Sequence, residues 1–468
     1  MTQDLTQVSA AGLAKLYRKG KASPVEAMKA VLARTDKVEP RINALCRIDA
    51  TESLAAARAS EKRWKNGKPL SPLDGVPVSI KDLILTKDWP TLRGSLTTSE
   101  DGPWDEDGPA VARAREAGMV FLGKVTTPEF GWKAVTDSPR TGVTRNPWDL
   151  SRTPGGSSGG SSAAVAAGLG PLSIASDGGG SIRTPAAFTA TVGLKPSYGR
   201  VPAHPPPYTG TLGCYGPIAR TVRDAAAFTN LLKQPDPRDW QALPYDPLDY
   251  LDGIEIGLRG ARIAYSPRLG YAPWVDPEVE AAVRDAVDTF RDLGAEVTVI
   301  GEIFDYPGEA FVTFFYGGVA DMLADLPPER FALVEPALQE VVRSASALTM
   351  KDLHAANRAR NALAHAFRMF MVDYDFLVTP TVTVPAFPTG LLRPNGPDGD
   401  PLLDWTPFTY PFNLTQDPAI SVPCGFSTGG LPIGLQIIGR MHDDAGVLRA
   451  ARAFEAARPF HQERPRGF

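Results

Sequence analysis

The sequence reads Pro154-Gly155-Gly156-Ser157-Ser158-Gly159-Gly160-Ser161-Ser162 at a first segment rich in glycine and serine, and the Ala-rich stretch Ala163–Ala167 follows it. A second such segment reads Ser176-Asp177-Gly178-Gly179-Gly180-Ser181-Ile182-Arg183 and comes directly after the apolar stretch Leu172–Ala175. Both are typical of junctions that lead into a helix, where backbone N–H groups converge in a concave nest. The residues alone allow an oxyanion hole or a phosphate nest. They favour the oxyanion hole, because neither segment carries a phosphate-loop motif.

A third segment places a lysine at the end of an apolar strand. It reads Asp74-Gly75-Val76-Pro77-Val78-Ser79-Ile80-Lys81-Asp82. A lysine that alternates into a buried strand is costly unless it is neutral or paired. Burial lowers the pKa of such a lysine, so that its amine can serve as a general base. A solvated lysine at a sheet edge is the other interpretation of Lys81.

The residues around these segments predict alternating strands and helices. From Leu73 onward, short apolar runs alternate with glycine-rich turns and Ala-rich helices, which is typical of an α/β layered fold. Before that point, residues 1–66 are expected to be helical. One helix there begins at Ser23-Pro24, because Ser is a favoured N-cap and Pro a favoured first helical residue.

A second α/β stretch follows a punctuating segment rich in Pro and Asp, residues 235–253. Strands are expected at Ala261–Tyr265 and Glu296–Ile300, with a helix between them that begins at Asp276-Pro277. This βαβ unit is expected to extend the same sheet. Further along, the pattern predicts a long helix over residues 350–371, a strand at 376–378 and a surface loop or lid over 391–405.

Composition and missing motifs argue against several function classes. The net charge is −4 and no run of Lys or Arg suggests a nucleic-acid partner. The five histidines form no HExxH or HxH motif, and the three cysteines form no CxxC pair, so no metal, cofactor or disulfide framework is expected. The letters GxSxG occur within residues 155–160, but no strand runs into them as a nucleophile elbow requires. Without a secretory signal or a long apolar span, a cytoplasmic protein with no membrane contact is expected.

The three segments together closely resemble the motifs of the amidase signature hydrolases. The family's GGSSGG core matches residues 155–160, its Asp-x-Gly-Gly-Ser-Ile-Arg motif matches 177–183, and its Gly-Val-Pro-x-x-x-Lys-Asp motif matches 75–82. The resemblance is dense from Leu73 to Asp224 and sparse to Gly439. It implies a large mixed central β-sheet covered by helices on both faces. It also implies a single domain over 1–468, with a helical segment at 1–66, a catalytic core at 67–234, and the rest of the sheet and the pocket helices at 254–468.

The resemblance implies a Ser–Ser–Lys triad. The family's nucleophile falls on Ser181, its base on Lys81, and its bridging serine, which follows a cis peptide bond, on Ser157 rather than on the adjacent Ser158. The oxyanion-hole amides fall on Gly178, Gly179, Gly180 and Ser181. Family members commonly have Thr or Ile where this chain has Gly178, and this difference leaves a hole made of backbone N–H groups intact.

Other side chains are expected to support the triad or line the substrate pocket. Asp177 and Arg183 flank the nucleophile and are expected to brace its loop rather than react. Ser158, Thr153 and Ser176 are weaker candidates for hydrogen bonds to the triad. The segment from His204 to Tyr208, with Cys214 and Tyr215, is expected to wall the entrance of the pocket. Aromatic residues of a second cluster are candidates for an apolar pocket or for ordinary core: Phe304, Phe311, Phe314, Phe315 and Tyr316.

The resemblance implies an amidohydrolase that cleaves the C–N bond of small amides through an acyl-enzyme, with carbamates, esters or aryl amides as further substrates. The expected partner is a small-molecule substrate, and the expected state is a monomer or homodimer. The alternative is the catalytic subunit of a glutamine-dependent tRNA amidotransferase, which shares these motifs but works in a complex. The Pro-rich stretch after Arg200 argues mildly against that alternative.

Overall fold

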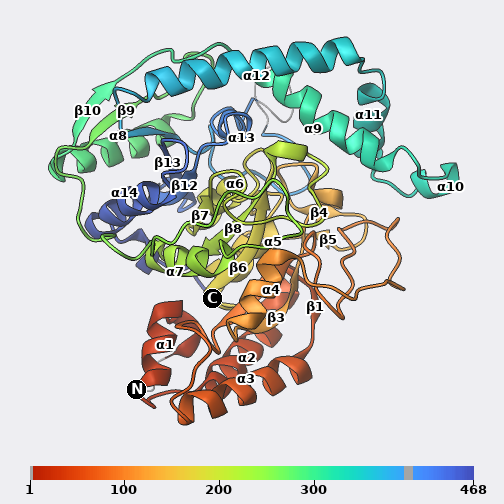
Figure 1. Ribbon diagram of the computed structural model, residues 1–468, viewed down its shortest axis with the longest axis vertical. Coiled ribbons are helices and arrows are strands. Elements are labelled where there is room, and N and C mark those ends of the chain that lie inside the picture. The colour runs from red at the N-terminus through yellow and green to blue at the C-terminus, as the bar shows by residue number, and fades with distance from the viewer. Residues whose placement is uncertain (1–3, 273, 395–403) are drawn as a thin grey trace.

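A mixed β-sheet runs through the molecule and carries helices on both faces (Figure 1). The structure is a computed structural model that describes residues 4–272, 274–394 and 404–468. The strands of this sheet span Leu45–Ile48 (β1), Pro77–Lys81 (β2), Val120–Val125 (β3), Leu172–Asp177 (β6), Val192–Lys195 (β7), Cys214–Ala219 (β8), Arg262–Tyr265 (β9), Glu296–Val299 (β10), Phe376–Pro380 (β11), Ala419–Phe426 (β12) and Pro432–Gly439 (β13). A separate pair of two-residue strands spans Asp137–Ser138 (β4) and Gly142–Val143 (β5).

The order of the strands mixes distant parts of the chain. Within the described residues, eleven strands pair in the order β1–β3–β2–β6–β8–β7–β12–β13–β11–β9–β10. The groups β3–β2–β6 and β11–β9–β10 are parallel, and the other neighbours are antiparallel. The mixed central sheet expected from the sequence is confirmed, as is the βαβ unit that extends it through β9 and β10.

Helices form two groups on the sheet and a separate N-terminal group. The α-helices span Ala10–Arg18 (α1), Pro24–Ile42 (α2), Ala50–Lys65 (α3), Pro109–Glu116 (α4), Gly159–Ala166 (α5), Arg183–Thr189 (α6), Val222–Leu232 (α7), Pro277–Asp292 (α8), Gly308–Leu323 (α9), Pro328–Phe331 (α10), Pro336–Ala345 (α11), Met350–Phe370 (α12), Pro411–Leu414 (α13) and Asp444–Ala457 (α14). Helices α5 and α6 contact each other and the central strands, whereas α7, α8 and α14 form a second contacting group. The N-terminal helices α1 to α3 lie at the bottom of Figure 1, and α12 crosses its top.

Local sequence signals account for several helix ends. In α2, Ser23 accepts a hydrogen bond from the Glu26 N–H while the Glu26 carboxylate accepts one from the Ser23 N–H, and Pro24 occupies the first turn. This capping box satisfies two N–H groups that the helix itself cannot bond. In α8, Asp276 caps the first turn and Pro277 begins the helix, as the sequence predicts.

Three features of the fold differ from the sequence-based expectations. The N-terminal segment is not entirely helical, because β1 forms the end strand of the sheet and pairs antiparallel with β3. The hairpin of β12 and β13, whose residues are almost all buried, was not predicted as strands. The expected loop over 391–405 falls partly on residues 395–403, which lie outside the described residues. At its end, Trp405 is buried and stacks on Phe188 with ring centroids 5.8 Å apart, so this side chain belongs to the core.

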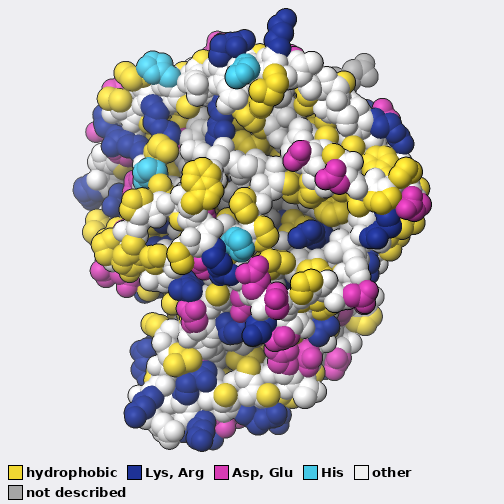
Figure 2. Space-filling view, turned by 45° about the vertical axis from the view of Figure 1, so that its right-hand side comes forward, with side chains coloured by type: hydrophobic (Ala, Val, Ile, Leu, Met, Phe, Trp, Pro, Cys, Tyr) yellow, Lys and Arg dark blue, Asp and Glu magenta, His cyan; other side chains and the backbone are white. Residues whose placement is uncertain are grey.

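The surface carries charges of both signs (Figure 2). Over the face shown in Figure 2, Lys and Arg are interspersed with Asp and Glu, and hydrophobic side chains lie singly or in small groups between them. Among the helices of the described residues, none is long and apolar enough to cross a membrane.

Candidate active site

Two parallel strands bring the predicted base and the second glycine-rich segment to the same edge of the sheet. Strands β2 and β6 are neighbours, with Ile80 opposite Ile174. The carboxyl ends of parallel neighbours lie side by side, so the last residue of β2, Lys81, lies beside the last residues of β6, Ser176 and Asp177. Polar residues at the carboxyl ends of parallel strands commonly form the ligand site of an α/β protein.

Lys81 is completely buried and contacts two serine hydroxyls. Its Nζ lies 2.6 Å from Ser157 Oγ and 3.0 Å from Ser176 Oγ. Burial lowers the pKa of Lys81 to about 7, although the nearby Asp177 charge acts in the opposite direction. An amine with such a pKa is largely neutral in mildly alkaline solution and can accept a proton from a hydroxyl group. Lys81 is therefore a buried strand lysine, and the solvated edge interpretation is wrong.

The loop that carries Ser157 is held tightly against neighbouring backbone. The peptide bond between Gly156 and Ser157 is cis. A Cβ atom on Gly156 would lie 2.7 Å from the Val135 carbonyl carbon, and one on Gly160 would lie 2.5 Å from the Thr126 backbone nitrogen. Side chains therefore cannot be accommodated at either glycine without displacing backbone atoms. The close approach explains why glycine occurs on both sides of the serine pair.

Two threonines also hold the Ser157 loop. The Gly155 N–H donates to Thr153 Oγ1 over 3.1 Å, and Thr136 Oγ1 donates to the Gly155 carbonyl over 2.8 Å. Ser158 donates its hydroxyl to the Ser176 carbonyl over 3.1 Å. Thr153 and Ser158 thus support the loop, whereas Ser176 contacts Lys81 directly.

Ser181 lies between β6 and α6 and lines the same cavity as Ser157. The carbonyl of Ser181 accepts a hydrogen bond from the Ser158 N–H over 3.1 Å, which ties the two glycine-rich segments together. Within the part of the chain that the structure describes, no hydrogen bond joins the hydroxyls of Ser157 and Ser181. Both serines line one open cavity.

The backbone amides around Ser181 differ in their partners. The Gly180 N–H donates to Asp177 Oδ1 over 2.7 Å, so this amide is already engaged. Among the described residues, the N–H groups of Gly178, Gly179 and Ser181 have no hydrogen-bond acceptor. Free, converging N–H groups are what an oxyanion hole requires. The expected four-amide hole is thus reduced to three candidates.

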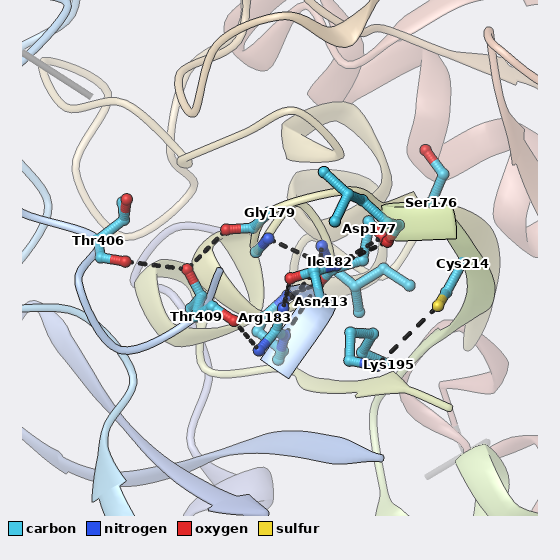
Figure 3. A network of polar contacts seen from close by, with 12 residues as sticks. Ser176, Asp177, Gly179, Ile182, Arg183, Lys195, Cys214, Thr406, Thr409 and Asn413 are labelled. Atoms are coloured by element: carbon cyan, nitrogen blue, oxygen red, sulfur yellow. Dashed lines mark hydrogen bonds and ion pairs between the residues drawn. The ribbon is translucent and has the colours of Figure 1, made fainter. Parts of the chain in front are cut away.

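Asp177 and Arg183 form a fully buried ion pair at the base of this loop (Figure 3). Arg183 Nη2 lies 2.9 Å from Asp177 Oδ1, and Arg183 Nε lies 3.0 Å from Oδ2. The same two Asp177 oxygens also accept hydrogen bonds from the N–H groups of Gly180 and Ile182. Burial would raise the pKa of Asp177, but the Arg183 charge and hydrogen bonds hold it below its ordinary value. The pair ties the side chain of Arg183 to the backbone of the loop.

Three residues far along the chain complete this network, and the sequence motifs did not identify them. Arg183 also donates to the Asn413 side-chain oxygen over 2.6 Å, to the Gln436 side-chain oxygen over 2.8 Å and to the Thr409 carbonyl over 2.8 Å. Asn413 in turn donates to Asp177 Oδ1 over 3.0 Å. Thr409 donates its hydroxyl to the Gly179 carbonyl over 2.7 Å (Figure 3). The loop that carries Ser181 is therefore fixed by side chains from α13, β13 and the segment before α13.

Replacement of Asp177 with asparagine is expected to destabilise the protein by about 3–5 kcal/mol, because the Arg183 charge would remain buried without its counter-charge. The urea concentration at the midpoint of unfolding measures this change. Asp149→Asn is the matched control, since Asp149 pairs at 3.6 Å with Arg152 at the surface, where an ion pair contributes about 0–1 kcal/mol. Equal, small shifts of the midpoint in both variants would contradict the bracing role.

A cavity of about 360 Å³ opens beside Ser181 and contains several of the expected pocket residues. Tyr208 and Phe315 line it, with ring centroids 6.0 Å apart. Cys214, Tyr215 and the stretch Pro205–Pro207 line it as well, in agreement with the expected entrance wall. A Cβ atom on Gly178 would lie 3.3 Å from the Phe315 ring. Glycine at this position therefore leaves room for the ring.

A second, smaller cavity of about 40 Å³ is also lined by Ser181. Ser181, Gly179 and Gly180 line it, together with the aromatic side chains Phe311 and Tyr316. The Phe311 ring stacks on Tyr410 with centroids 4.8 Å apart and is also buried in the core. Ser181 thus faces two spaces of very different size.

Two of the expected pocket residues lie elsewhere. Phe304 is buried against Tyr271 and Phe367, with ring centroids 6.0 and 6.2 Å away, and it lines neither cavity. Phe314 lies under the Arg360 guanidinium at 5.4 Å and also lines neither cavity. In α9, Phe311 and Phe315 are four residues apart and share one face, whereas Phe314 is turned about 100° around the helix from Phe315, toward Arg360.

Comparisons with known proteins agree with this geometry. A family model described as Amidase matches residues 26–448. The chain is 39% identical to an acylamidase of Rhodococcus erythropolis, over 99% of this chain and 98% of that protein. It is also 39% identical to a glutamyl-tRNA(Gln) amidotransferase subunit of Myxococcus xanthus, over 97% of this chain and 98% of that protein. The crystal structure of a bacterial aryl acylamidase of the amidase signature family is similar, with a TM-score of 0.92, 31% identity and 98% of each chain covered.

Proposed function

The chain belongs to the amidase signature family of C–N hydrolases, and on that premise we propose that it hydrolyses small amides through an acyl-enzyme on Ser181. One observation carries the proposal. A fully buried lysine, Lys81, lies 2.6 Å from the hydroxyl of Ser157, and Ser157 shares a cavity with Ser181. Such an arrangement can deprotonate a serine without histidine, since a serine hydroxyl attacks well only when a base accepts its proton.

In the proposed first half-reaction, Ser181 Oγ attacks the carbonyl carbon of the amide. The proton of Ser181 passes to Ser157, whose own proton passes to neutral Lys81. The C–N bond then breaks, and the leaving amine takes a proton from Ser157, which Lys81 replaces. Water attacks the resulting ester by the same proton route, and the acid leaves. Lys81 is neutral again at the end of each cycle, as its lowered pKa allows.

The negative charge of the tetrahedral intermediate is expected to lie against the free N–H groups of Gly178, Gly179 and Ser181. Loss of one such donor typically costs about 3–4 kcal/mol in the transition state. Because these donors are backbone groups, their position depends on the loop that Asp177 and Arg183 hold. The brace therefore contributes to catalysis by fixing the amides before the substrate binds.

The two cavities suggest where the acyl part and the amine part of the substrate bind. Ser157 returns the proton to the leaving nitrogen, so the amine part must lie on the side of Ser157. Ser157 lines the larger cavity and is absent from the lining of the smaller one. The acyl part then enters the smaller cavity of about 40 Å³, which has room for only a few atoms. We therefore favour amides of short acyl chains with a larger amine part, anilides included.

A substrate panel tests the function. Acetanilide, the longer acyl anilides, acetamide, phenyl acetate and a phenyl carbamate are each incubated with the enzyme, and release of amine or phenol is measured. The proposal expects cleavage of acetanilide and a fall of kcat/KM as the acyl chain lengthens. Esters and carbamates present the same carbonyl to Ser181, so we expect some of them to be cleaved. If the enzyme cleaved none of the amides in the panel, the proposal would be wrong.

The tRNA amidotransferase subunit is the second candidate, because the two relatives described above share the same 39% identity with the chain. The stretch Pro205–Pro207, which argued against this candidate in the sequence, lines the cavity beside Ser181. Purification of the tagged chain from its own source decides between the hydrolase and the amidotransferase subunit. Hydrolysis of acetanilide by the chain alone favours the hydrolase, whereas a second protein that co-purifies and is required for glutamine hydrolysis favours the amidotransferase.

A further inference from the structure

The cavity beside Ser181 contains an arginine side chain that is not paired with a carboxylate. Arg93 lines this cavity and is half-buried. Across residues 4–272, 274–394 and 404–468, its guanidinium forms no hydrogen bond and no ion pair. Asp321 lines the same cavity but is exposed and is not paired with Arg93. Arg183 near the same cavity, by contrast, is paired with Asp177.

The backbone of Arg93 is firmly held. Its N–H donates to the Asp82 carbonyl over 3.1 Å, and its own carbonyl accepts the Phe130 N–H over 2.7 Å. Arg93 has a φ of 57°, in the left-handed region that non-glycine residues seldom adopt. At the next residue, Gly94, a Cβ atom would lie 2.7 Å from the Thr127 carbonyl oxygen. A tight loop in the segment between β2 and α4 thus presents the arginine to the cavity.

The surroundings of Arg93 make an anionic partner favourable. The cavity walls include the side chains of Phe130, Tyr215 and Phe315, so part of the lining is apolar. A guanidinium donates in a planar fork that matches the two oxygens of a carboxylate. Among the described residues, the charged ones that line the cavity are Arg93, Asp177 and Asp321, and Asp177 is already neutralised by Arg183. Arg93 is therefore the cation available to a ligand there.

We propose that Arg93 binds a carboxylate on the amine part of the substrate, so that the preferred substrates are short-chain N-acyl derivatives of amino acids or aminobenzoates. This inference rests on the proposed function, because the amine part is assigned to the larger cavity from the proton route through Ser157. Arg93 acts as a specificity-determining residue and takes no part in bond breaking.

Matched substrates test the proposal. 4-Acetamidobenzoate carries the carboxylate, and 4-nitroacetanilide carries a neutral nitro group of the same shape. The ratio of kcat/KM for the carboxylate over the nitro substrate is expected to fall about 10- to 100-fold in Arg93→Met, mainly through KM, since a hydrogen bond to a charged group contributes about 1.5–3 kcal/mol. Arg93→Lys is expected to recover part of this loss. An unchanged ratio in Arg93→Met overturns the proposal.

Two controls separate this inference from the proposed function. Arg358→Met removes an exposed arginine of α12 and is expected to leave the ratio as in the wild type. Succinanilic acid carries its carboxylate on the acyl side, and an equally large response of this substrate to Arg93→Met would overturn the assignment to the amine side. If the wild type cleaves neither anilide, the proposed function fails.

If the wild type cleaves neither anilide, titration calorimetry still tests the carboxylate site. The affinity of Ser181→Ala for 4-acetamidobenzoate is measured with and without Arg93→Met. A dissociation constant about 10- to 100-fold higher in the double variant supports the carboxylate site. Equal affinities, or no binding to either variant, overturn it.

Discussion

Replacement of Ser181 with alanine is expected to lower kcat for acetanilide by about 10⁴-fold or more, because the acyl-enzyme can no longer form. When a hydrolase of this type loses its nucleophile, the remaining rate enhancement comes only from the oxyanion hole and from substrate binding. Ser181 is partly exposed to the cavity and its hydroxyl makes no hydrogen bond within the described residues, so its removal is expected to leave the fold intact. Steady-state kinetics and the thermal midpoint of unfolding measure the two effects.

The matched control for Ser181→Ala is Ser161→Ala. The Ser161 hydroxyl is buried in α5 and has no hydrogen-bond partner among the described residues, so its loss removes the same atom without touching the cavity. This control is expected to keep its turnover. If Ser181→Ala retained a comparable turnover, the nucleophile would have to be another group, and the proposed mechanism would be wrong.

Replacement of Lys81 with methionine is the second large effect, with an expected loss in kcat of about 10²–10⁴-fold, the range that general-base groups contribute. Methionine has a similar length and no charge, so the buried site of Lys81 remains filled. Ser157 would lose the group 2.6 Å away that takes its proton. The thermal midpoint of the variant is expected to stay at or above that of the wild type, since a desolvated amine has been removed.

The pH profile gives an independent measure of Lys81. Burial lowers the pKa of this amine to about 7, and only the neutral form can accept a proton. In the wild type, kcat/KM is therefore expected to rise with pH through an apparent pKa near 7 and to fall about tenfold per pH unit below it. The residual activity of Lys81→Met should lack this step, whereas Lys195→Met, which removes another buried lysine outside the relay, should keep it. A step that persists without Lys81 would assign the pKa to another group.

The parts of the site that depend on neighbours in sequence could be predicted. Lys81 was expected at the end of an apolar strand, and β2 ends at that residue. The strand before Ser176 and the loop before Arg183 were expected from alternating apolar runs and glycines, and the loop lies between β6, which ends at Asp177, and α6, which begins at Arg183. In each case the signal is local, because periodicity and glycine mark where a strand stops and a loop begins.

The parts that depend on distant residues could not be predicted. Asn413 and Gln436 reach Arg183 from more than 200 residues away, and neither stands in a pattern that marks it as a partner. Phe304 was grouped with the pocket aromatics because it lies close to them in sequence, but it packs on Phe367 in the core. One local contact was missed as well, since the Gly180 N–H donates to Asp177 in the same loop.

Trapping of the acyl-enzyme tests the central claim most directly. The enzyme is mixed with 4-nitrophenyl acetate, quenched in acid within milliseconds and digested, and the peptides are examined by mass spectrometry. The mechanism predicts one acetyl group on the peptide that contains Ser181, and no acetylated peptide from Ser181→Ala treated in the same way. An acetyl group on Ser157, Ser158 or Cys214 in the wild type, with Ser181 unmodified, would contradict it.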